Sequence, residues 1–289
     1  MPATRIGMSP NLRSWLLASP LALILGLFLI LPIATIVVVS FWSYNEFTFF
    51  ADFSLANYEY LLTSSVTLAT YLKTFQYVIL TWAICTIVGF TVAYFLAFHV
   101  KSVPWQTALF LLCTVPFWTS NIIRMISWIP SLGRNGLVNS ALMGMGVTDQ
   151  PLDWLLFSDF SVVLAFVHLY TLFMVVPIFN TMMRIDRSLI EAARDGGANG
   201  FQILTNVIIP LCKPGIMIGS IFIVTLVMGD FVTVRFMSGG QSASVGRVIS
   251  NEIALLQYPA AAADAVVLLA TVLIMIAVMM RFVDIRKEL

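Results

Sequence analysis

A polar connection between two long apolar runs decides how this chain folds: residues 188–210 read SLIEAARDGGANGFQILTNVIIP. Ser188 is followed three residues later by Glu191, which is the spacing of a capping box. This spacing predicts that a helix begins at Ser188. Glu191 would then lie in the first turn, where the helix dipole favours a carboxylate.

The residues after Glu191 predict a short helix with one slim face. Ala192 and Ala193 are strong helix formers with little side-chain bulk, so another surface can approach them closely. Gly197 follows, and glycine often ends a helix because it adopts the left-handed conformation at little cost. A second amphipathic run then leads to Pro210. The stretch therefore predicts a surface helix lying crosswise between two membrane helices.

Apolar runs flank this connection and recur along the whole chain. Of the 289 residues, 60% are hydrophobic and 10% are charged, and the mean hydropathy is +0.96. Runs of about 20 apolar residues match the thickness of the bilayer's hydrocarbon core. Since alternating ten-residue strands are missing from the sequence, the spans must be helical. We predict an all-α membrane protein, residues 1–289 forming one domain, with six spans at 15–42, 72–98, 105–130, 159–183, 214–237 and 260–283.

The first apolar run could also be a cleaved signal peptide, because Arg5 and Arg13 precede it. It is, however, too long for a signal peptide's apolar core, and no small-residue cleavage site follows it. We therefore expect it to be retained as the first membrane helix.

Charge is distributed unequally between the two sides that six alternating helices would create. The cations gather on one side: Arg5, Arg13, Lys101, Arg184, Arg187, Arg194, Lys213, Arg281, Arg286 and Lys287. The opposite side carries mainly carboxylates: Glu46, Asp52, Glu59, Asp149, Asp153, Asp159 and Glu252. Cytoplasmic loops carry the excess of Lys and Arg in membrane proteins. The pattern places both termini and residues 188–210 in the cytoplasm.

The connection also resembles a known family motif. Glu191-Ala192-Ala193, Gly197 and Pro210 stand at the spacing of the EAA motif of permease subunits of binding-protein-dependent ABC importers. Val207 and Ile209 replace the usual Ile and Leu of that motif. The resemblance implies the transmembrane domain of a type I ABC importer, in which Ser188 to Pro210 forms the coupling helix that seats in an ATPase. An ordinary surface helix start is the alternative reading of the tripeptide alone.

Two further stretches resemble the spermidine/putrescine permease branch of this family: residues 116–120, PFWTS, with Arg124, and residues 229–233, GDFVT. The chain departs from that branch at Val234, where we expect a proline. The resemblance favours a polyamine as the substrate. Amino-acid-like or phosphonate-like solutes stay open, because Arg124 and Arg235 would attract anions.

Ionisable groups within the membrane are costly, so each is a functional candidate. Arg124 lies inside the third span and Asp230 inside the fifth. We expect a translocation path lined by Trp118, Asn121, Arg124, Asp230, Phe231 and Thr233. The alternative is that Arg124 and Asp230 form a structural pair. We further expect His168 to form a hydrogen bond between helices and Asp264 to lie at the membrane interface.

The first external loop, residues 43–71, is rich in aromatic residues. These rings could form an interfacial belt, because amphipathic rings favour the headgroup region. A docking surface for another protein is the other interpretation.

No spacing in the sequence suggests a catalytic nucleophile with its base, a metal-ligand cluster or a phosphate-binding P-loop. We therefore predict that the chain is not an enzyme and carries no cofactor, with ATP and Mg²⁺ held by a partner. The resemblance implies three protein partners: an ABC ATPase dimer, a second homologous permease and an external substrate-binding protein. Membrane lipid surrounds the chain, and nothing favours nucleic acid.

Two rival functions are weaker. An ion-driven secondary transporter would show inverted repeats and broken helices, and neither is evident in the sequence. A membrane enzyme or an assembly scaffold would leave the spacing from Glu191 to Pro210 unexplained.

Overall fold

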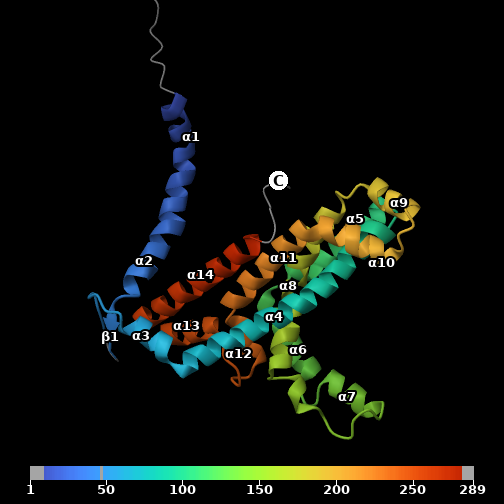
Figure 1. The fold of residues 1–289 in the computed structure, drawn as a ribbon. Helices are drawn as coiled ribbons and strands as arrows, with labels where there is room; N and C mark the ends of the chain where they lie inside the picture. Colours follow the sequence, from blue (N-terminus) through green and yellow to red (C-terminus); the bar gives the residue numbers. More distant parts are fainter. Residues whose placement is uncertain (1–9, 46–47, 282–289) are drawn as a thin grey trace, which may run out of the picture.

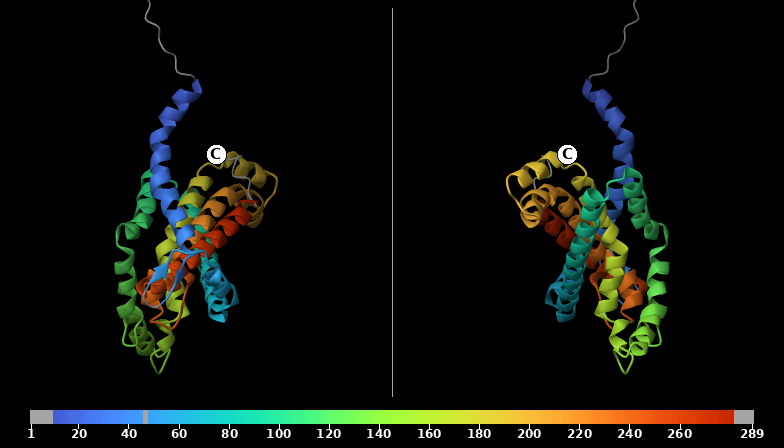
Figure 2. Two further views of the ribbon diagram at one scale, coloured as in Figure 1. Left: turned by 90° about the vertical axis from the view of Figure 1, so that its left-hand side faces the viewer. Right: turned by 90° about the vertical axis from the view of Figure 1, so that its right-hand side faces the viewer.

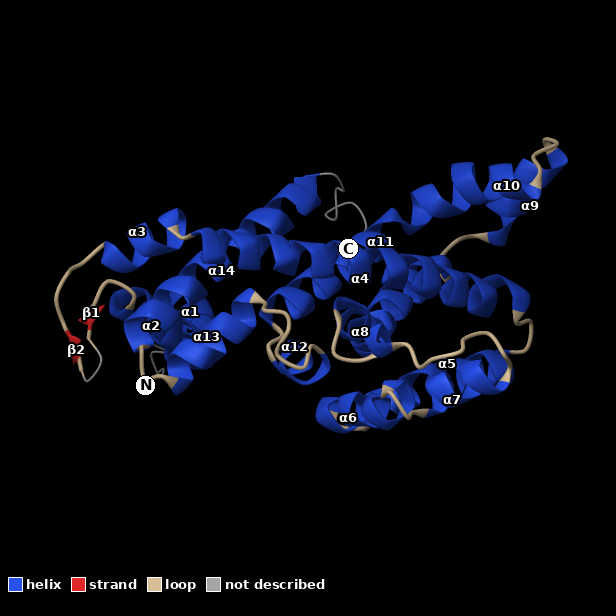
Figure 3. Cartoon of the chain, turned by 90° about the horizontal axis from the view of Figure 1, so that it is seen from below, coloured by secondary structure: helices blue, strands red, loops and turns tan. Residues whose placement is uncertain are grey.

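The computed structural model describes residues 10–45 and 48–281, and it is almost entirely helical. The described strands are short: β1 (Ser43–Tyr44) and β2 (Phe49–Phe50) pair in an antiparallel hairpin, with Ser43 opposite Phe50 (Figure 3). Arg5, Glu46, Arg286, Lys287 and the last two residues of the sixth predicted span lie outside the described residues.

The helices follow one another with short connections. The N-terminal half contains α1 (Pro10–Leu25), the π-helical turn η1 (Gly26–Ile30), α2 (Leu31–Val39), α3 (Ala56–Thr63), α4 (Ser65–Tyr94), η2 (Phe95–His99), α5 (Val103–Thr114), η3 (Val115–Trp118), α6 (Asn121–Leu132) and α7 (Leu137–Gly144). The C-terminal half contains η4 (Asp153–Leu155), α8 (Asp159–Met182), α9 (Arg187–Asp195), α10 (Gly200–Ile203), η5 (Leu204–Ile208), α11 (Ile209–Gly229), α12 (Val232–Met237), α13 (Val245–Ala254) and α14 (Tyr258–Arg281).

By length and composition, the described residues contain five helices able to cross a membrane, and up to six if one sharply bent pair counts as a span. The fold class predicted from the sequence is therefore confirmed. The helix α8 coincides with the fourth predicted span and α14 with most of the sixth. The second begins earlier than predicted, at Ser65, because the Ser64 side chain accepts a hydrogen bond from the Thr67 amide and caps the helix.

The third predicted span, residues 105–130, is not one straight helix. The segments Val103–Trp118 and Asn121–Gly144 meet at an angle of 88°. Between them Thr119 is extended, with φ −96° and ψ 150°, and Ser120 has ψ 137°. Pro116, which lacks an amide hydrogen, lies in the 3₁₀ turn just before the break. The third predicted span therefore covers parts of two helices that meet at a sharp bend.

The fifth predicted span, residues 214–237, was wrong at both ends. Its helix begins at Gly200 and runs through α10, η5 and α11 to Gly229. At Asp230 the backbone is extended, with φ −81° and ψ 113°, and the short helix α12 follows. The structure thus has a second helix break, which apolar composition alone did not reveal.

The core lies where α4, α8 and α11 cross, and small residues let these helices approach closely. A Cβ atom on Gly215 would lie 2.4 Å from Thr181 Oγ1 and 2.6 Å from the Pro177 carbonyl oxygen. Gly89 of α4 and Gly219 of α11 both lie against Met174 of α8. Helices in lipid gain little from the hydrophobic effect, so close packing at small residues is what holds them together.

We therefore expect Gly215→Ala to destabilise the helix bundle, because the added methyl group meets backbone that cannot move aside. Overpacking of this kind costs about 1–3 kcal/mol. Gly26→Ala is the matched control, since a Cβ atom at Gly26 has nothing within 4 Å. The measurement is the midpoint of thermal unfolding in detergent. Equal midpoints for the two variants would contradict the packing argument.

The first helix stands apart from this core. Figures 1 and 2 show α1 projecting away from the bundle, and no residue of the membrane-length window within Leu17–Val39 is buried. The bundle contacts it mainly through α2, which lies against α14. A long apolar face of this helix is therefore left for lipid or another chain.

Candidate functional site

The surface helix predicted from residues 188–210 is α9, and it begins differently from the expectation. Asp186, not Ser188, is the N-cap: its Oδ1 accepts a hydrogen bond from the Ser188 amide at 2.9 Å. The predicted capping box of Ser188 with Glu191 was therefore wrong. The reason is that two good capping residues stand two positions apart, and the earlier one is used.

The end of α9 lies where Gly197 predicted it. Gly197 has φ +83°, and its amide donates to the Arg194 carbonyl at 2.9 Å. The Ala198 amide donates to the Ala193 carbonyl at 3.0 Å. These two hydrogen bonds form a Schellman motif, in which the residue in the left-handed conformation is usually glycine. The spacing between Ala193 and Gly197 is thus the spacing that this helix end requires.

A second capped helix follows at once. Asn199 caps α10 through a capping box with Gln202, with both hydrogen bonds at 2.9 Å. The π-helical turn η5 comes before Pro210, which lies in the first turn of α11. A wider turn ahead of a proline relieves the clash of its ring with the preceding carbonyls. The segment therefore enters the membrane helix α11 without a break.

The two faces of α9 differ in burial. Ile190 and Ala193 pack against the core, whereas Glu191 and Ala192 are exposed. Beside Glu191 lies a groove of about 390 Å³ that Lys101, Arg187 and Arg194 also line. Figure 1 shows α9 and α10 together at the end of the bundle opposite β1 and α3. A polar groove and a slim helix face are thus presented at one end of the molecule.

The revised cap leads to a prediction. Asp186→Ala should make the backbone amides of α9 exchange their hydrogens with solvent about fivefold faster, because the helix loses its N-cap. Ser188→Ala is the control and should exchange normally. The hydrogen bond from the Ser188 amide holds the pKa of Asp186 below its usual range. The stability that this cap adds to α9 is therefore present above the unfolded pKa of about 4. It is lost as pH falls through the lowered pKa of the folded state. Hydrogen exchange by mass spectrometry checks the rates, and faster exchange in Ser188→Ala alone would restore Ser188 as the cap.

The two helix breaks lie close together, because α6 and α12 pack against each other and α12 also contacts α8. Arg124 of α6 is 7% exposed and donates from Nη2 to Asn121 Oδ1 at 2.5 Å. Its Nε atom is buried and has no hydrogen-bond partner within the described residues. The structure thus brings the predicted path residues of the third and fifth spans to one region.

Asp230 is held by neighbours other than Arg124. The Tyr170 hydroxyl donates to Asp230 Oδ2 at 2.5 Å, and the Thr233 amide donates to Oδ1 at 2.8 Å. The Thr233 hydroxyl donates to Oδ2 at 2.7 Å. Arg124 and Asp230 do not form an ion pair with each other within the described residues. Asp230 therefore closes the first turn of α12, and Tyr170 is a site residue that the sequence analysis did not single out.

Exposure separates the predicted path residues into two groups. Trp118 is 84% exposed and Phe231 is 39% exposed, each next to a helix break. Thr233 is fully buried, so its side chain supports Asp230 and does not itself meet open space. The lining role of these residues stays a prediction. The expected helix contact of His168 is present, since Trp128 Nε1 donates to His168 Nδ1 at 3.0 Å.

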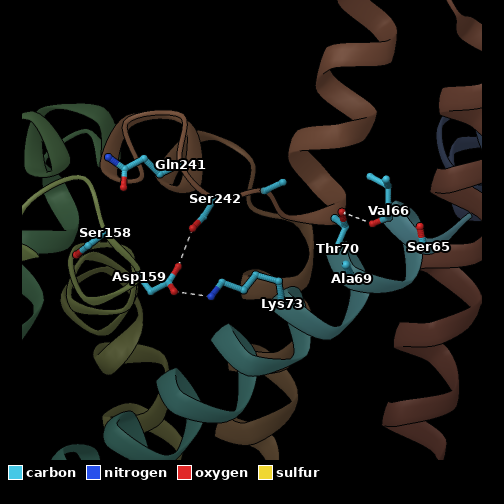
Figure 4. A pocket seen from close by; sticks show the side chains of 10 residues that line it. Ser65, Val66, Ala69, Thr70, Lys73, Ser158, Asp159, Gln241 and Ser242 are labelled. Carbon is cyan, nitrogen blue, oxygen red and sulfur yellow. Dashed lines mark hydrogen bonds and ion pairs between the residues drawn. The ribbon is translucent and has the colours of Figure 1, made fainter.

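A polar pocket of about 770 Å³ opens at the end of the bundle away from α9, and no motif pointed to it. Figure 4 shows Lys73 and Ser242 both directed at Asp159, which comes from the first turn of α8. Lys73 forms an ion pair with Asp159, Tyr77 donates to it at 2.6 Å, and Ser242 donates at 2.7 Å. Each of these three residues stands more than 80 positions from Asp159 in the chain, so sequence spacing could not reveal the cluster.

Asp264 is buried inside the protein, and its expected place at the membrane interface stays a prediction. It is 2% exposed and lies in the second turn of α14 beside Glu252 of α13.

The searched residues 10–45 and 48–281 hold no cluster of His, Cys, Asp and Glu able to bind a metal ion.

These features define the class of protein: a multi-pass membrane protein built from broken and unbroken helices. Residues 89–286 match the model of the binding-protein-dependent transport system inner membrane component, and the chain belongs to that family. It is thus the inner-membrane permease subunit of an ABC importer. Broken helices alone would also suit a secondary transporter, and the family membership decides against it.

Relatives and solved structures agree with this assignment. The chain is 31% identical over 246 residues to the spermidine/putrescine transport system permease protein PotB of Escherichia coli strain K12, covering 84% of this chain and 88% of PotB. Its fold is similar to a chain of a bacterial ABC transporter that imports the acidic polysaccharide alginate, with TM-score 0.74, 16% identity and coverage of 93% and 95%. The alginate transporter in complex with an alginate-bound periplasmic protein gives TM-score 0.73, 16% identity and coverage of 92% and 93%.

Proposed function

We propose that this chain forms half of a translocation path for a polyamine, driven by ATP that a separate ATPase dimer hydrolyses. A second homologous permease supplies the other half, and an external binding protein delivers the solute. The observation that carries this proposal is the 31% identity to a spermidine/putrescine permease over 84% of the chain. ATP and Mg²⁺ are bound by the ATPase partner.

The coupling role of α9 is supported by its shape and position. The exposed Glu191 and Ala192 leave a face that a groove on another protein can accept. Because both ends of α9 are capped, the helix can move as a unit with α10 and α11. Closure of the ATPase would then be passed to the broken helix α11–α12. An element with two discrete arrangements is what such transmission requires.

Two surfaces are suited to the other partners. The unburied first helix offers an apolar face to a second permease chain. The end carrying β1, α3 and the polar pocket of Asp159 is suited to a substrate-binding protein. In this arrangement the chain's termini and α9 are cytoplasmic, as the distribution of Lys and Arg indicates.

The proposed path lies at the two breaks. Trp118 and Phe231 offer aromatic faces, which attract alkylammonium groups, and Asp230 offers a carboxylate. Arg124 is the feature that favours a second candidate, an anionic or zwitterionic solute, because its buried Nε has no partner among the described residues. The proposed pair of permeases, the ATPase dimer and the binding protein are the same for either kind of substrate.

The test is uptake by the assembled transporter. This chain, its partner permease, the ATPase dimer and the binding protein are reconstituted in liposomes and given radiolabelled putrescine. We expect uptake that needs internal ATP and persists when ion gradients are collapsed. Uptake driven by an ion gradient without ATP would overturn the proposal. ATP-driven uptake of an amino acid or a phosphonate, with none of putrescine, would overturn the substrate alone.

A further inference from the structure

A small polar cavity lies between α3, α4, α13 and α14, at the end of the bundle away from α9 (Figure 1). Its volume is about 80 Å³, and its polar lining comes from Tyr60, Thr67, Thr70, Tyr71, Glu252 and Asp264. One molecule of liquid water takes about 30 Å³. The cavity therefore has room for a small polar group.

Two acidic side chains meet in this cavity. Glu252 of α13 and Asp264 of α14 lie within hydrogen-bonding distance of each other, and Asp264 is 2% exposed. In residues 10–45 and 48–281 the ion pairs are Lys73 with Asp159 and Arg134 with Asp153, so neither acid has a cationic partner there. Two buried carboxylates without a counter-charge are strongly disfavoured.

The same cavity contains polar atoms that lack partners. The Tyr71 hydroxyl and Glu252 Oε2 are buried without a hydrogen-bond partner among the described residues. Asp264, although almost completely buried, receives no hydrogen bond from an N–H group or a hydroxyl in that part of the chain. Native proteins rarely leave buried polar groups unpaired. Unpaired acceptors and an uncompensated negative charge together indicate a missing cation with N–H donors.

We propose that this cavity binds one primary alkylammonium group, the end of a polyamine, held by Glu252, Asp264 and Tyr71. An ammonium group carries three donors, which the two carboxyl groups and the tyrosine oxygen can accept. The ring of Tyr60 adds an aromatic face. This inference rests on the proposed polyamine substrate and adds a binding site separate from the two helix breaks.

The cavity adjoins the larger pocket of Asp159, which we infer to be its entrance. Val66 and Thr70 line both this cavity and the larger pocket of Asp159, where Figure 4 shows them on the same stretch of α4. Lys73 in the larger pocket is paired with Asp159, which offsets its repulsion of a cation. A polyamine approaching through the larger pocket would therefore meet the acidic cavity with one end.

Binding should be linked to a proton. Burial, together with the nearby charge of Asp264, raises the pKa of Glu252 to about 8, so the empty acid pair holds a proton at neutral pH. The other titratable groups that face the pair are Tyr44 of β1, Tyr60 of α3 and Tyr71 of α4. The arriving ammonium group replaces that proton, which leaves to solvent. Putrescine affinity should therefore fall as pH is lowered below about 8.

The experiment uses the assembled permease–ATPase complex in lipid nanodiscs, without the binding protein. Equilibrium binding of radiolabelled putrescine is measured, with butylamine and potassium chloride as competitors. We expect saturable binding that butylamine displaces. The affinity should fall at least about tenfold in Glu252→Gln/Asp264→Asn and about threefold in Tyr71→Phe. Glu59→Gln, which removes an exposed carboxylate of α3 outside the cavity, is the control.

Several outcomes would overturn the site. Unchanged putrescine affinity in both Glu252→Gln/Asp264→Asn and Tyr71→Phe would do so, and Tyr71→Phe keeps the side-chain volume should the double variant misfold. Displacement by potassium but not by butylamine would indicate an inorganic cation instead. The site and the proposed substrate fail separately: butylamine binding that depends on Glu252 supports the site even if liposomes import no putrescine.

Discussion

Replacing Gly197 by valine should abolish ATP-driven uptake while leaving the protein inserted in the membrane. Gly197 has φ +83°, where a β-branched residue is strained. The left-handed conformation costs ordinary residues about 1–2 kcal/mol. The strain arises in the backbone alone, because a Cβ atom at Gly197 has nothing within 4 Å. The Schellman hydrogen bonds would be lost, and with them the orientation of α9 relative to α10.

Gly196→Val is the matched control, since Gly196 has φ −74° and a Cβ atom there makes ordinary contacts at 3.4 Å and beyond. The measurements are putrescine uptake in liposomes and co-purification of the ATPase. We expect both to fall at least about tenfold for Gly197→Val and to change little for Gly196→Val. Full uptake by Gly197→Val would show that α9 does not couple the ATPase to the membrane helices.

The sequence predicted the class of the helices, long and apolar, because lipid imposes a simple rule on composition. It did not predict the helix breaks, because an apolar run looks the same whether its helix is straight or bent. Pro116 was visible, but the backbone becomes extended only at Thr119 and Ser120, three residues later. At Asp230 the break depends on hydrogen bonds from Tyr170 and Thr233, and Tyr170 is 60 positions away.

The course of the segment containing α9 and α10 was largely predictable because its determinants are local. The end of α9 follows from one glycine, and only the choice between Asp186 and Ser188 as the cap was missed. The burial of Asp264 was not predictable, for the opposite reason. A charge near a helix start suggests an interface, and nothing in the order of residues shows that Glu252 covers it from another helix.

Asp230→Asn should reduce putrescine uptake at least about tenfold, because it removes the negative charge that attracts the ammonium group. Asparagine keeps Oδ1, which accepts the hydrogen bond of the Thr233 amide, so α12 should keep its start. The substitution therefore removes the charge and keeps the hydrogen bond to the Thr233 amide, while the Tyr170 and Thr233 hydroxyls must turn to accept from Nδ2. Without an ion pair to Arg124 within the described residues, the full charge of Asp230 is available to an ammonium group.

Tyr170→Phe separates charge from geometry, because it removes the hydrogen bond to Asp230 Oδ2 and leaves the carboxyl group itself in place. If Asp230 attracts the substrate, Tyr170→Phe should change uptake by no more than about twofold. The measurement is the concentration dependence of putrescine uptake with saturating ATP. Normal uptake by Asp230→Asn with defective uptake by Tyr170→Phe would mean that Asp230 only holds α12 in place. The ammonium-attracting role would then pass to the aromatic faces of Trp118 and Phe231, which border the same two breaks.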